Sequence, residues 1–304
     1  MSEKRNWRQG LGSVAVSLVF LSLGVLVAQA PAFRCSPAMI NLIEKTLNLS
    51  YFQCRVEAPF KMHGRNTDTR GRQAVPCPTD AHLVLVTGQS NSANFLMADD
   101  YQHSNVYNAF DGQCYALQDP VLGATNHAKS LMPAIASKLD VDKPLVFLTT
   151  GWSSTSILDW ANPDFELASY TNQELKRLQD QGLTLEAMVW IQGEQDAHTT
   201  TDYEAEFSKA MDLVFNGIAA RDTATLIVTQ STICGRRTPD THLQAAQAAV
   251  HLGAQPAIVA INTDTLGHDF RHDTCHYNAA GVEKIATAIA KPLQDVLTTG
   301  PTAQ

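Results

Sequence analysis

The sequence lacks any run of basic residues interleaved with aromatic residues, the pattern that is typical of a nucleic-acid-binding surface. Charged residues make up only 17% of the 304 residues, and acidic ones are in excess, which gives a formal net charge of -8. A mildly acidic chain is not attracted to the phosphates of nucleic acids or to anionic membrane surfaces. We therefore expect no nucleic-acid partner.

Motifs typical of metal sites and of thiol redox sites are also missing. The chain has no C-x-x-C pair and no H-E-x-x-H motif, so a zinc ribbon, a thioredoxin-like site and a zinc protease site are not supported. His268, His272 and His276 are spaced by four, and on a helix they would share one face and could bind a transition metal. The residues between them have weak helix propensity and no apolar stripe, so we expect a loop, with no metal and no cofactor.

Charge is absent from residues 11–30, a run long enough to cross a bilayer as a helix. Basic residues precede the run, an arrangement that keeps the N-terminus in the cytoplasm and exports the residues after the run. Small residues before Phe33 resemble a signal-peptide cleavage site. We expect residues 1–32 to be a signal peptide or a membrane anchor. Either alternative places the rest of the chain in the periplasm or outside the cell, with membrane contact only through an uncleaved N-terminal segment.

All six cysteines lie beyond this hydrophobic run. An even number of cysteines in an exported chain predicts disulfide bonds rather than free thiols. We expect Cys35, Cys54 and Cys77 to cross-link a lead segment, residues 33–80. Because three is an odd number, at least one of them must pair with a cysteine further along the chain.

Apolar strand-like runs alternate with helical patterns over residues 81–304. The strand-like runs are residues 82–86, 144–149, 187–191, 225–229 and 257–261, and the helical patterns lie around 129–139, 166–181, 202–220, 240–252 and 279–297. Strands that are apolar on both faces and separated by helices predict a parallel sheet that is covered on both sides. We predict an α/β fold: a three-layer sandwich with a central, mostly parallel five-stranded sheet, preceded by the N-terminal hydrophobic helix.

Residues suited to acyl transfer come after four of the predicted strands. Ser90 comes after the first strand, at a predicted turn into a helix that starts near Ser92, and Gly151 comes after the second. The polar residues 192–196 come after the third strand, and residues 268–276 after the fifth. Because the carboxyl ends of parallel strands share one edge of a sheet, a nucleophile, a base with a carboxylate and amide donors would meet there. Taken alone, Ser90 is equally well explained as a helix N-cap.

Four blocks of sequence, in the expected order, resemble the conserved blocks of SGNH hydrolases. They are Gly88-Gln89-Ser90-Asn91, the segment from Gly151 to Trp160, Trp190-Ile191-Gln192-Gly193-Glu194, and Asp273-x-x-His276-Tyr277-Asn278-x-x-Gly281. The blocks are most similar to the sialate O-acetylesterase-like branch, which includes acetylxylan esterases of carbohydrate esterase family six. The resemblance implies a flavodoxin-like SGNH fold over residues 81–304. The nucleophile elbow of other serine hydrolases, G-x-S-x-G, fits less well because Ser92 stands in place of its second glycine.

The resemblance also implies catalytic roles for the matching residues. Ser90 is expected to be the nucleophile and His276 the general base. Two carboxylates stay open as the acid partner, because the superfamily uses the residue at Asp273, whereas the glutamate at Glu194 has also been assigned that role in this branch.

The oxyanion hole and the substrate contacts are less fully specified. The N–H groups of Ser90 and Gly151 are the expected oxyanion donors. The asparagine that usually supplies a third donor is absent, so Gln192 or Gln195 would have to replace it. Asn91 and Trp152 are candidate substrate contacts.

The implied function is a serine esterase that removes O-acetyl groups from an exported carbohydrate through an acetyl-serine intermediate. Three alternatives remain open: a carbohydrate O-acetyltransferase that uses the same site, a metal-dependent hydrolase, and a non-catalytic carbohydrate-binding protein on the same scaffold.

Overall fold

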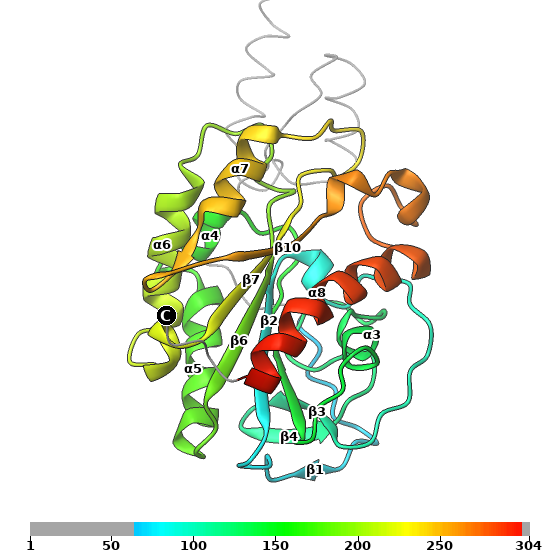
Figure 1. Ribbon diagram of the computed structural model, residues 1–304, viewed down its shortest axis with the longest axis vertical. Coiled ribbons are helices and arrows are strands. Elements are labelled where there is room, and N and C mark those ends of the chain that lie inside the picture. The colour runs from blue at the N-terminus through cyan, green and yellow to red at the C-terminus, as the bar shows by residue number, and fades with distance from the viewer. Residues whose placement is uncertain (1–63, 300–304) are drawn as a thin grey trace, which may run out of the picture. The chain divides into compact units, whose positions relative to one another are not determined.

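The structure is a computed structural model that describes residues 64–299 (Figure 1). These residues belong to one compact unit, Lys61–Gln304. The predicted signal peptide or anchor, and the partners of Cys35 and Cys54, whose pairing the sequence leaves open, lie outside the described residues. Within residues 64–299, no helix is both long enough and apolar enough to span a membrane.

A twisted sheet runs through the centre of this unit. Its strands, in chain order, are β1 (Ala74–Val75), β2 (His82–Gly88), β3 (Val106–Phe110), β4 (Gln113–Ala116), β5 (Leu145–Thr149), β6 (Leu185–Ile191), β7 (Thr225–Gln230) and β10 (Ile258–Asn262). They are arranged in the order β1-β4-β3-β5-β2-β6-β7-β10. The six strands β3, β5, β2, β6, β7 and β10 are parallel to one another. At one edge, β4 is antiparallel to both β3 and β1. A separate small hairpin joins β8 (His251–Leu252) to β9 (Gln255–Pro256).

The prediction of a five-stranded sheet is wrong in size, because the sheet has eight strands. The predicted strands correspond to β2, β5, β6, β7 and β10, and they lie in the order β5-β2-β6-β7-β10, which is the flavodoxin-like order. The additional strands β3 and β4 form a hairpin through Asp111 and Gly112. Polar residues such as Asn108 and Gln113 interrupt both strands, so neither shows the apolar run that identifies a buried strand.

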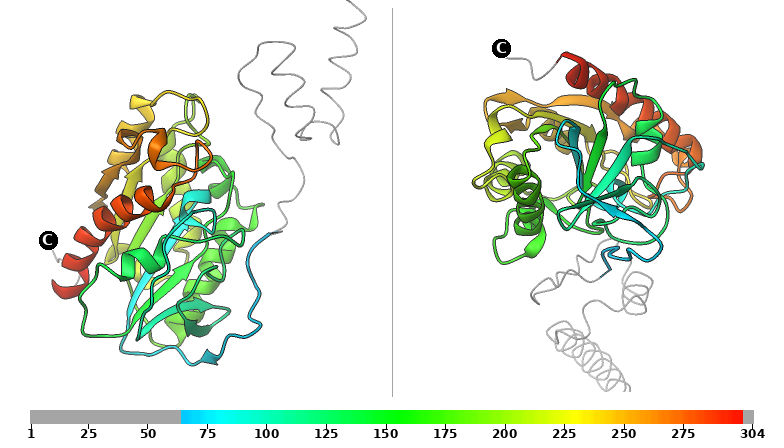
Figure 2. Two further views of the ribbon diagram at one scale, coloured as in Figure 1. Left: turned by 90° about the vertical axis from the view of Figure 1, so that its right-hand side faces the viewer. Right: turned by 90° about the horizontal axis from the view of Figure 1, so that it is seen from below.

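Helices cover both faces of the sheet, as predicted for a three-layer sandwich (Figures 1 and 2). One face is covered by α3 (Met132–Ala136) and α8 (Ala279–Thr299), and the other by α4 (Ile157–Trp160), α5 (Glu166–Asp180), α6 (Tyr203–Val214) and α7 (Thr241–Ala249). In α8 the apolar residues Val282, Ile285, Ile289 and Leu293 are spaced by three or four and are buried, which is the stripe expected of a helix packed on a sheet.

Two disulfide bonds cross-link the described residues. Cys77 pairs with Cys114 in β4, and Cys234 pairs with Cys275. Cys77 therefore bonds outside residues 33–80, as the odd number of cysteines in that segment requires. Each bond closes a loop of about 40 residues (sequence separations of 37 and 41), and the loss of chain entropy in the unfolded state corresponds to about 4 kcal/mol.

Candidate active site

Ser90 lies in a tight turn at the carboxyl end of β2. Gly88 ends that strand with φ 126°, and a Cβ atom there would lie 2.1 Å from the backbone oxygen of Ile191 in β6. Only glycine fits this close approach. Ser90 is then the first residue of a short 3-10 turn, η2 (Ser90–Ser92), and Gln89 occupies the cap position. Ser90 is therefore not a helix N-cap.

The helix predicted to start near Ser92 is wrong, because the structure has only the 3-10 turn there. Beyond that turn the backbone N–H groups bond to a neighbouring loop instead of to their own segment. Asn94 donates to the carbonyl of Thr125, and Leu96 donates to that of Lys129. Tertiary hydrogen bonds thus outweigh the local helix propensity of the segment.

Gly151 packs directly against the turn that holds Ser90. A Cβ atom on Gly151 would lie 2.3 Å from Ser92 Oγ, so this glycine is also required by a close contact. The next residue, Trp152, donates its N–H to the carbonyl of Gly88 over 2.9 Å. The loop after β5 and the turn after β2 are therefore in contact, as the strand-end argument predicts.

Gln89 is a structural residue of the site to which the sequence interpretation gave no role. Its Oε1 atom accepts hydrogen bonds from the N–H groups of Gly193 (3.2 Å) and Gln195 (3.3 Å). The side chain is buried, and it fixes the loop after β6 to the residue that precedes Ser90. A large amide side chain at the end of an otherwise apolar buried strand is the signal that could have identified it.

Gln192 holds together the elements behind this loop. Its Nε2 group donates to the carbonyl of Thr155 (3.1 Å) and to the carboxylate of Asp196, and its Oε1 accepts a hydrogen bond from Tyr203 (2.7 Å). Both Nε2 hydrogens are thus engaged. The structure therefore does not favour Gln192 as the third oxyanion donor. Gln195 is only partly buried, and its backbone N–H is held by Gln89.

Asp196 is a buried acid within this network. It accepts hydrogen bonds from Gln192 and from the backbone N–H of Ile157 at the start of α4. Burial raises its pKa to about 7, although the two hydrogen bonds favour the charged form. The carboxyl group therefore changes its charge close to neutral pH.

Replacing Asp196 with asparagine is expected to weaken the dependence of stability on pH. Because the pKa is raised from 3.8 to about 7 on folding, the folded protein keeps a proton on Asp196 over a pH range in which the unfolded chain has already released it. The stability that this proton contributes is fully present below about pH 4 and is lost as the pH rises through about 7, at about 1.4 kcal/mol per pH unit. Urea unfolding measures the free energy of unfolding at pH 5 and at pH 8. Between these two pH values it should fall by about 2–3 kcal/mol more in the parent protein than in Asp196→Asn. An equal fall in the parent protein and in Asp196→Asn would contradict the raised pKa. The control is Asp269→Asn, at an exposed position, whose free energy of unfolding should fall as that of the parent does.

Asn91 connects the Ser90 turn to two other strand-end loops. Its Nδ2 group donates to Glu194 Oε1 (2.7 Å) and lies 3.5 Å from the carbonyl oxygen of Cys275. Glu194 is buried, and this desolvation raises its pKa against the opposing hydrogen bond from Asn91. The hydrogen-bond partner of the Glu194 carboxylate is thus Asn91.

His276 is paired with the carboxylate of Asp273. The imidazole Nδ1 lies 2.7 Å from Asp273 Oδ2, while Asp273 Oδ1 accepts the backbone N–H groups of Cys275 (3.1 Å) and His276 (2.7 Å). Partial burial by itself would raise the pKa of Asp273, but the hydrogen bonds from the His276 ring and from the two N–H groups outweigh it and lower the pKa. The carboxylate is therefore ionised and holds the proton of His276 on Nδ1.

The segment that carries this pair is a loop, which confirms the prediction against a helix. It contains the 3-10 turn η5 (His268–Phe270) and a short antiparallel bridge between Arg271 and Tyr277. The disulfide between Cys234 and Cys275 fixes the loop beside His276.

Contacts on both sides of His276 join it to the chain segment after Ser90. The His276 ring stacks on Phe95 with 4.9 Å between ring centroids. The carbonyl of Tyr277 accepts the N–H of Met97 over 3.1 Å, and Cys275 contacts Asn91 as described above. The chain segment around the Ser90 turn and the loop that carries the Asp273–His276 pair are thus in contact.

The predicted substrate contacts are not favoured by their burial. Asn91 is fully buried and bonded to Glu194, and Trp152 is only 5% exposed.

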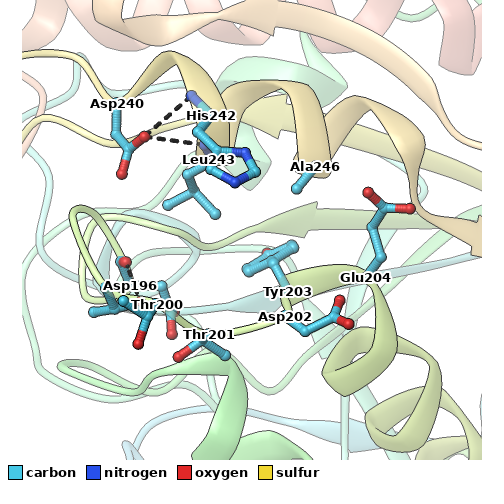
Figure 3. Close-up of a pocket in the computed structure, with 11 residues that line it drawn as sticks. Asp196, Thr200, Thr201, Asp202, Tyr203, Glu204, Asp240, His242, Leu243 and Ala246 are labelled. Carbon is cyan, nitrogen blue, oxygen red and sulfur yellow. Dashed lines mark hydrogen bonds between the residues drawn. The ribbon is translucent and has the colours of Figure 1, made fainter.

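A cavity of about 430 Å³ lies between the N-terminal ends of α6 and α7 (Figure 3). It is lined by residues that include Asp196, Tyr203 and His242, but not by Ser90, Asp273 or His276.

Solved structures with the same fold come from other proteins of low sequence identity. A protein from Arabidopsis thaliana is 13% identical, with a TM-score of 0.57 over 74% of this chain and 100% of that one. NanS is 10% identical, with a TM-score of 0.52 over 74% of this chain and 98% of that one. Comparison with curated proteins gives no significant match.

The Ser90 turn and the Asp273–His276 pair follow strands of the parallel sheet, and the family that the chain matches defines its class, a carboxylic ester hydrolase. Residues 127–295, just over half of the chain, match the family described as carbohydrate esterase, sialic acid-specific acetylesterase. The chain belongs to this family, and the predicted resemblance to sialate O-acetylesterase-like enzymes is confirmed. The matched region includes Gly151, Glu194, Asp273 and His276 and begins after Ser90.

Proposed function

We propose that the protein is an exported serine esterase that removes O-acetyl groups from a carbohydrate through an acetyl-serine intermediate. The observation that best supports this proposal is the hydrogen-bonded pair of Asp273 and His276, tied through Asn91, Phe95 and Met97 to the Ser90 turn. The family supports an acetylated carbohydrate as substrate.

In the proposed first step, Ser90 Oγ attacks the carbonyl carbon of the acetyl ester. Because Asp273 holds the proton of His276 on Nδ1, the Nε2 lone pair is available to take the hydroxyl proton of Ser90. The tetrahedral intermediate then collapses, and the protonated His276 gives its proton to the departing sugar oxygen. In the second step His276 takes a proton from water, and the resulting hydroxide attacks acetyl-Ser90. The second tetrahedral intermediate releases acetate as His276 gives its proton back to Ser90 Oγ.

The oxyanion of each tetrahedral intermediate would be held by the backbone N–H groups of Ser90 and Gly151. The close packing of Gly151 on the Ser90 turn supports this assignment. Loss of one such donor typically raises the barrier by about 3 kcal/mol. Since the amide hydrogens of Gln192 are engaged by Thr155 and Asp196, our proposal relies on the two backbone donors.

Export is proposed from the N-terminal sequence together with the disulfides. The bonds Cys77–Cys114 and Cys234–Cys275 are the kind of cross-link that persists in an oxidising compartment. An O-acetylated carbohydrate in the periplasm or outside the cell is then the accessible substrate.

Acetate release from a panel of acetyl esters tests this function. We expect the purified chain to release acetate from 4-nitrophenyl acetate and from O-acetylated carbohydrates, including O-acetylated sialic acid and acetylated xylan. An organophosphonate should block turnover and label Ser90, as detected by mass spectrometry of the peptide. The absence of acetate release, or loss of activity with chelators but not with the organophosphonate, would contradict the proposal. Acetyl transfer to an added sugar in place of hydrolysis would identify a transferase.

A further inference from the structure

Three potential metal ligands lie together on the exposed side of the His276 loop. One ligand atom each from His272, Asp273 and His276 lies within 4.8 Å of the other two. Two imidazoles and one carboxylate form a ligand set that zinc accepts in sites with three protein ligands and an open fourth position. His268, the third histidine with the same spacing, is not part of the cluster.

The ring of His272 has one nitrogen that is free to bind a metal ion. Its Nε2 atom lies 3.0 Å from the carbonyl oxygen of Phe95. Because a carbonyl oxygen only accepts hydrogen bonds, Nε2 carries the proton, and Nδ1 is left unprotonated. A ring N–H donated to a backbone carbonyl is the outer hydrogen bond that metal-binding histidines usually make.

The loop backbone holds the ligands close to one another. The N–H of His272 donates to the carbonyl of His276 over 2.9 Å, and the two rings are 6.0 Å apart at an angle of 27°. The adjacent Cys275 is fixed by its disulfide to Cys234. Little conformational freedom is then lost when an ion binds.

We propose that His272, Asp273 and His276 bind a divalent transition metal ion such as Zn²⁺, and that the bound ion reversibly inhibits the esterase. The ion would bind His276 as a neutral imidazole whose proton has moved from Nδ1 to Nε2, and it would be coordinated by Nδ1 and Asp273 Oδ2. These two atoms are 2.7 Å apart, whereas neighbouring ligands on a tetrahedral zinc ion are about 3.3 Å apart, so a small opening of the pair is sufficient.

The inhibition rests on the proposed function, but the binding does not. With a metal ion on Asp273 and on His276 Nδ1, the imidazole carries its proton on Nε2 and can no longer accept the hydroxyl proton of Ser90. The site is thus a regulatory one, distinct from the catalytic metal site of the metal-dependent hydrolase that the sequence leaves open as an alternative. Hard cations such as Mg²⁺, which prefer oxygen ligands, should neither bind there nor inhibit.

Zinc binding to the purified, chelator-treated chain tests the site by isothermal titration calorimetry. We expect the parent protein to bind one zinc ion at this site and His272→Gln to bind at least about 10-fold more weakly. Glutamine keeps an amide donor for the Phe95 carbonyl but lacks the second ring nitrogen. His268→Gln, at an exposed position in the same loop, is the matched control and should bind zinc as the parent does.

Zinc inhibition of 4-nitrophenyl acetate hydrolysis provides the second measurement. His272→Gln should retain its basal activity but need at least about 10-fold more zinc for half-inhibition. An absence of zinc binding, or equal zinc affinity of His272→Gln and the parent, would overturn the site. Zinc binding that depends on His272 in a chain without esterase activity would support the site and contradict the proposed function instead.

Discussion

Replacing Ser90 with alanine is expected to lower kcat for acetyl ester hydrolysis by about four to six powers of ten. The substitution removes the only oxygen that the proposed mechanism acetylates, so the covalent route is lost rather than slowed. A reduction of this size corresponds to about 5–8 kcal/mol in the activation barrier. The activity that remains should be the small contribution of binding and of the oxyanion donors.

The fold should tolerate this change. Ser90 is the first residue of η2, and its backbone carbonyl accepts the N–H of Ala93, a bond that alanine preserves. Circular dichroism and thermal unfolding of Ser90→Ala should therefore match the parent. Ser153→Ala, in the neighbouring loop after β5, is the control and should keep near-parental kcat. If Ser90→Ala retained more than about 1% of kcat, the acetyl-serine mechanism would be wrong.

The central strands β2, β5, β6 and β7 could be predicted from the sequence because nearly all of their residues are buried. All residues of β2 and β5 are buried, so their sequences are continuous apolar runs that differ from the amphipathic helices between them. The edge strands β3 and β4 could not be predicted in the same way. In each of them two adjacent buried residues are flanked by partly or fully exposed ones, and polar side chains are included, so neither the continuous nor the alternating apolar pattern of a strand is present.

The conformation after Ser90 depends on contacts that the local sequence does not contain. Residues 92–97 are compatible with a helix, yet Asn94 and Leu96 bond to the loop around Thr125 and Lys129. That loop is about 30 residues away from Asn94 in the sequence. A local propensity is a weak predictor where tertiary hydrogen bonds compete with it.

In the candidate site, too, one part could be predicted from the sequence and another part depends on tertiary contacts. The strand-end argument predicts that Ser90, Gly151 and the residues around Glu194 and His276 share one edge of the sheet, and contacts between their loops agree with it. The sequence does not determine the partner of each side chain. The engagement of Gln192 depends on Tyr203, Asp196 and Thr155, which belong to different elements around it.

Replacing Asp273 with asparagine is expected to lower kcat by about three to four powers of ten with little change in KM. Asp273 Oδ1 accepts two backbone N–H groups, from Cys275 and His276, while Oδ2 faces the His276 ring. In the variant those N–H groups hold the amide oxygen, and the amide NH₂ is turned toward Nδ1. Because two donors cannot face each other, Nδ1 must become the acceptor, and the proton moves to Nε2. His276 can then no longer take the proton of Ser90.

The corresponding change at Glu194 is expected to have a much smaller effect. Glu194→Gln keeps the oxygen that accepts the Asn91 hydrogen bond, and the neutral amide suits a buried position where desolvation already raises the pKa of the acid. We expect a loss in kcat of no more than about 10-fold, which reflects altered positioning of Asn91 rather than a lost proton acceptor.

Steady-state kinetics of the two variants, with Asp269→Asn as a control in the same loop, distinguish the two acids that the sequence leaves open. The geometry favours Asp273, because the hydrogen bond of 2.7 Å joins it to His276, whereas Glu194 bonds to Asn91. A larger loss in Glu194→Gln than in Asp273→Asn would assign the acid to Glu194. In that case the pair formed by Asp273 and His276 would need to rearrange when substrate binds, since apo hydrogen bonds of catalytic groups can change in the complex.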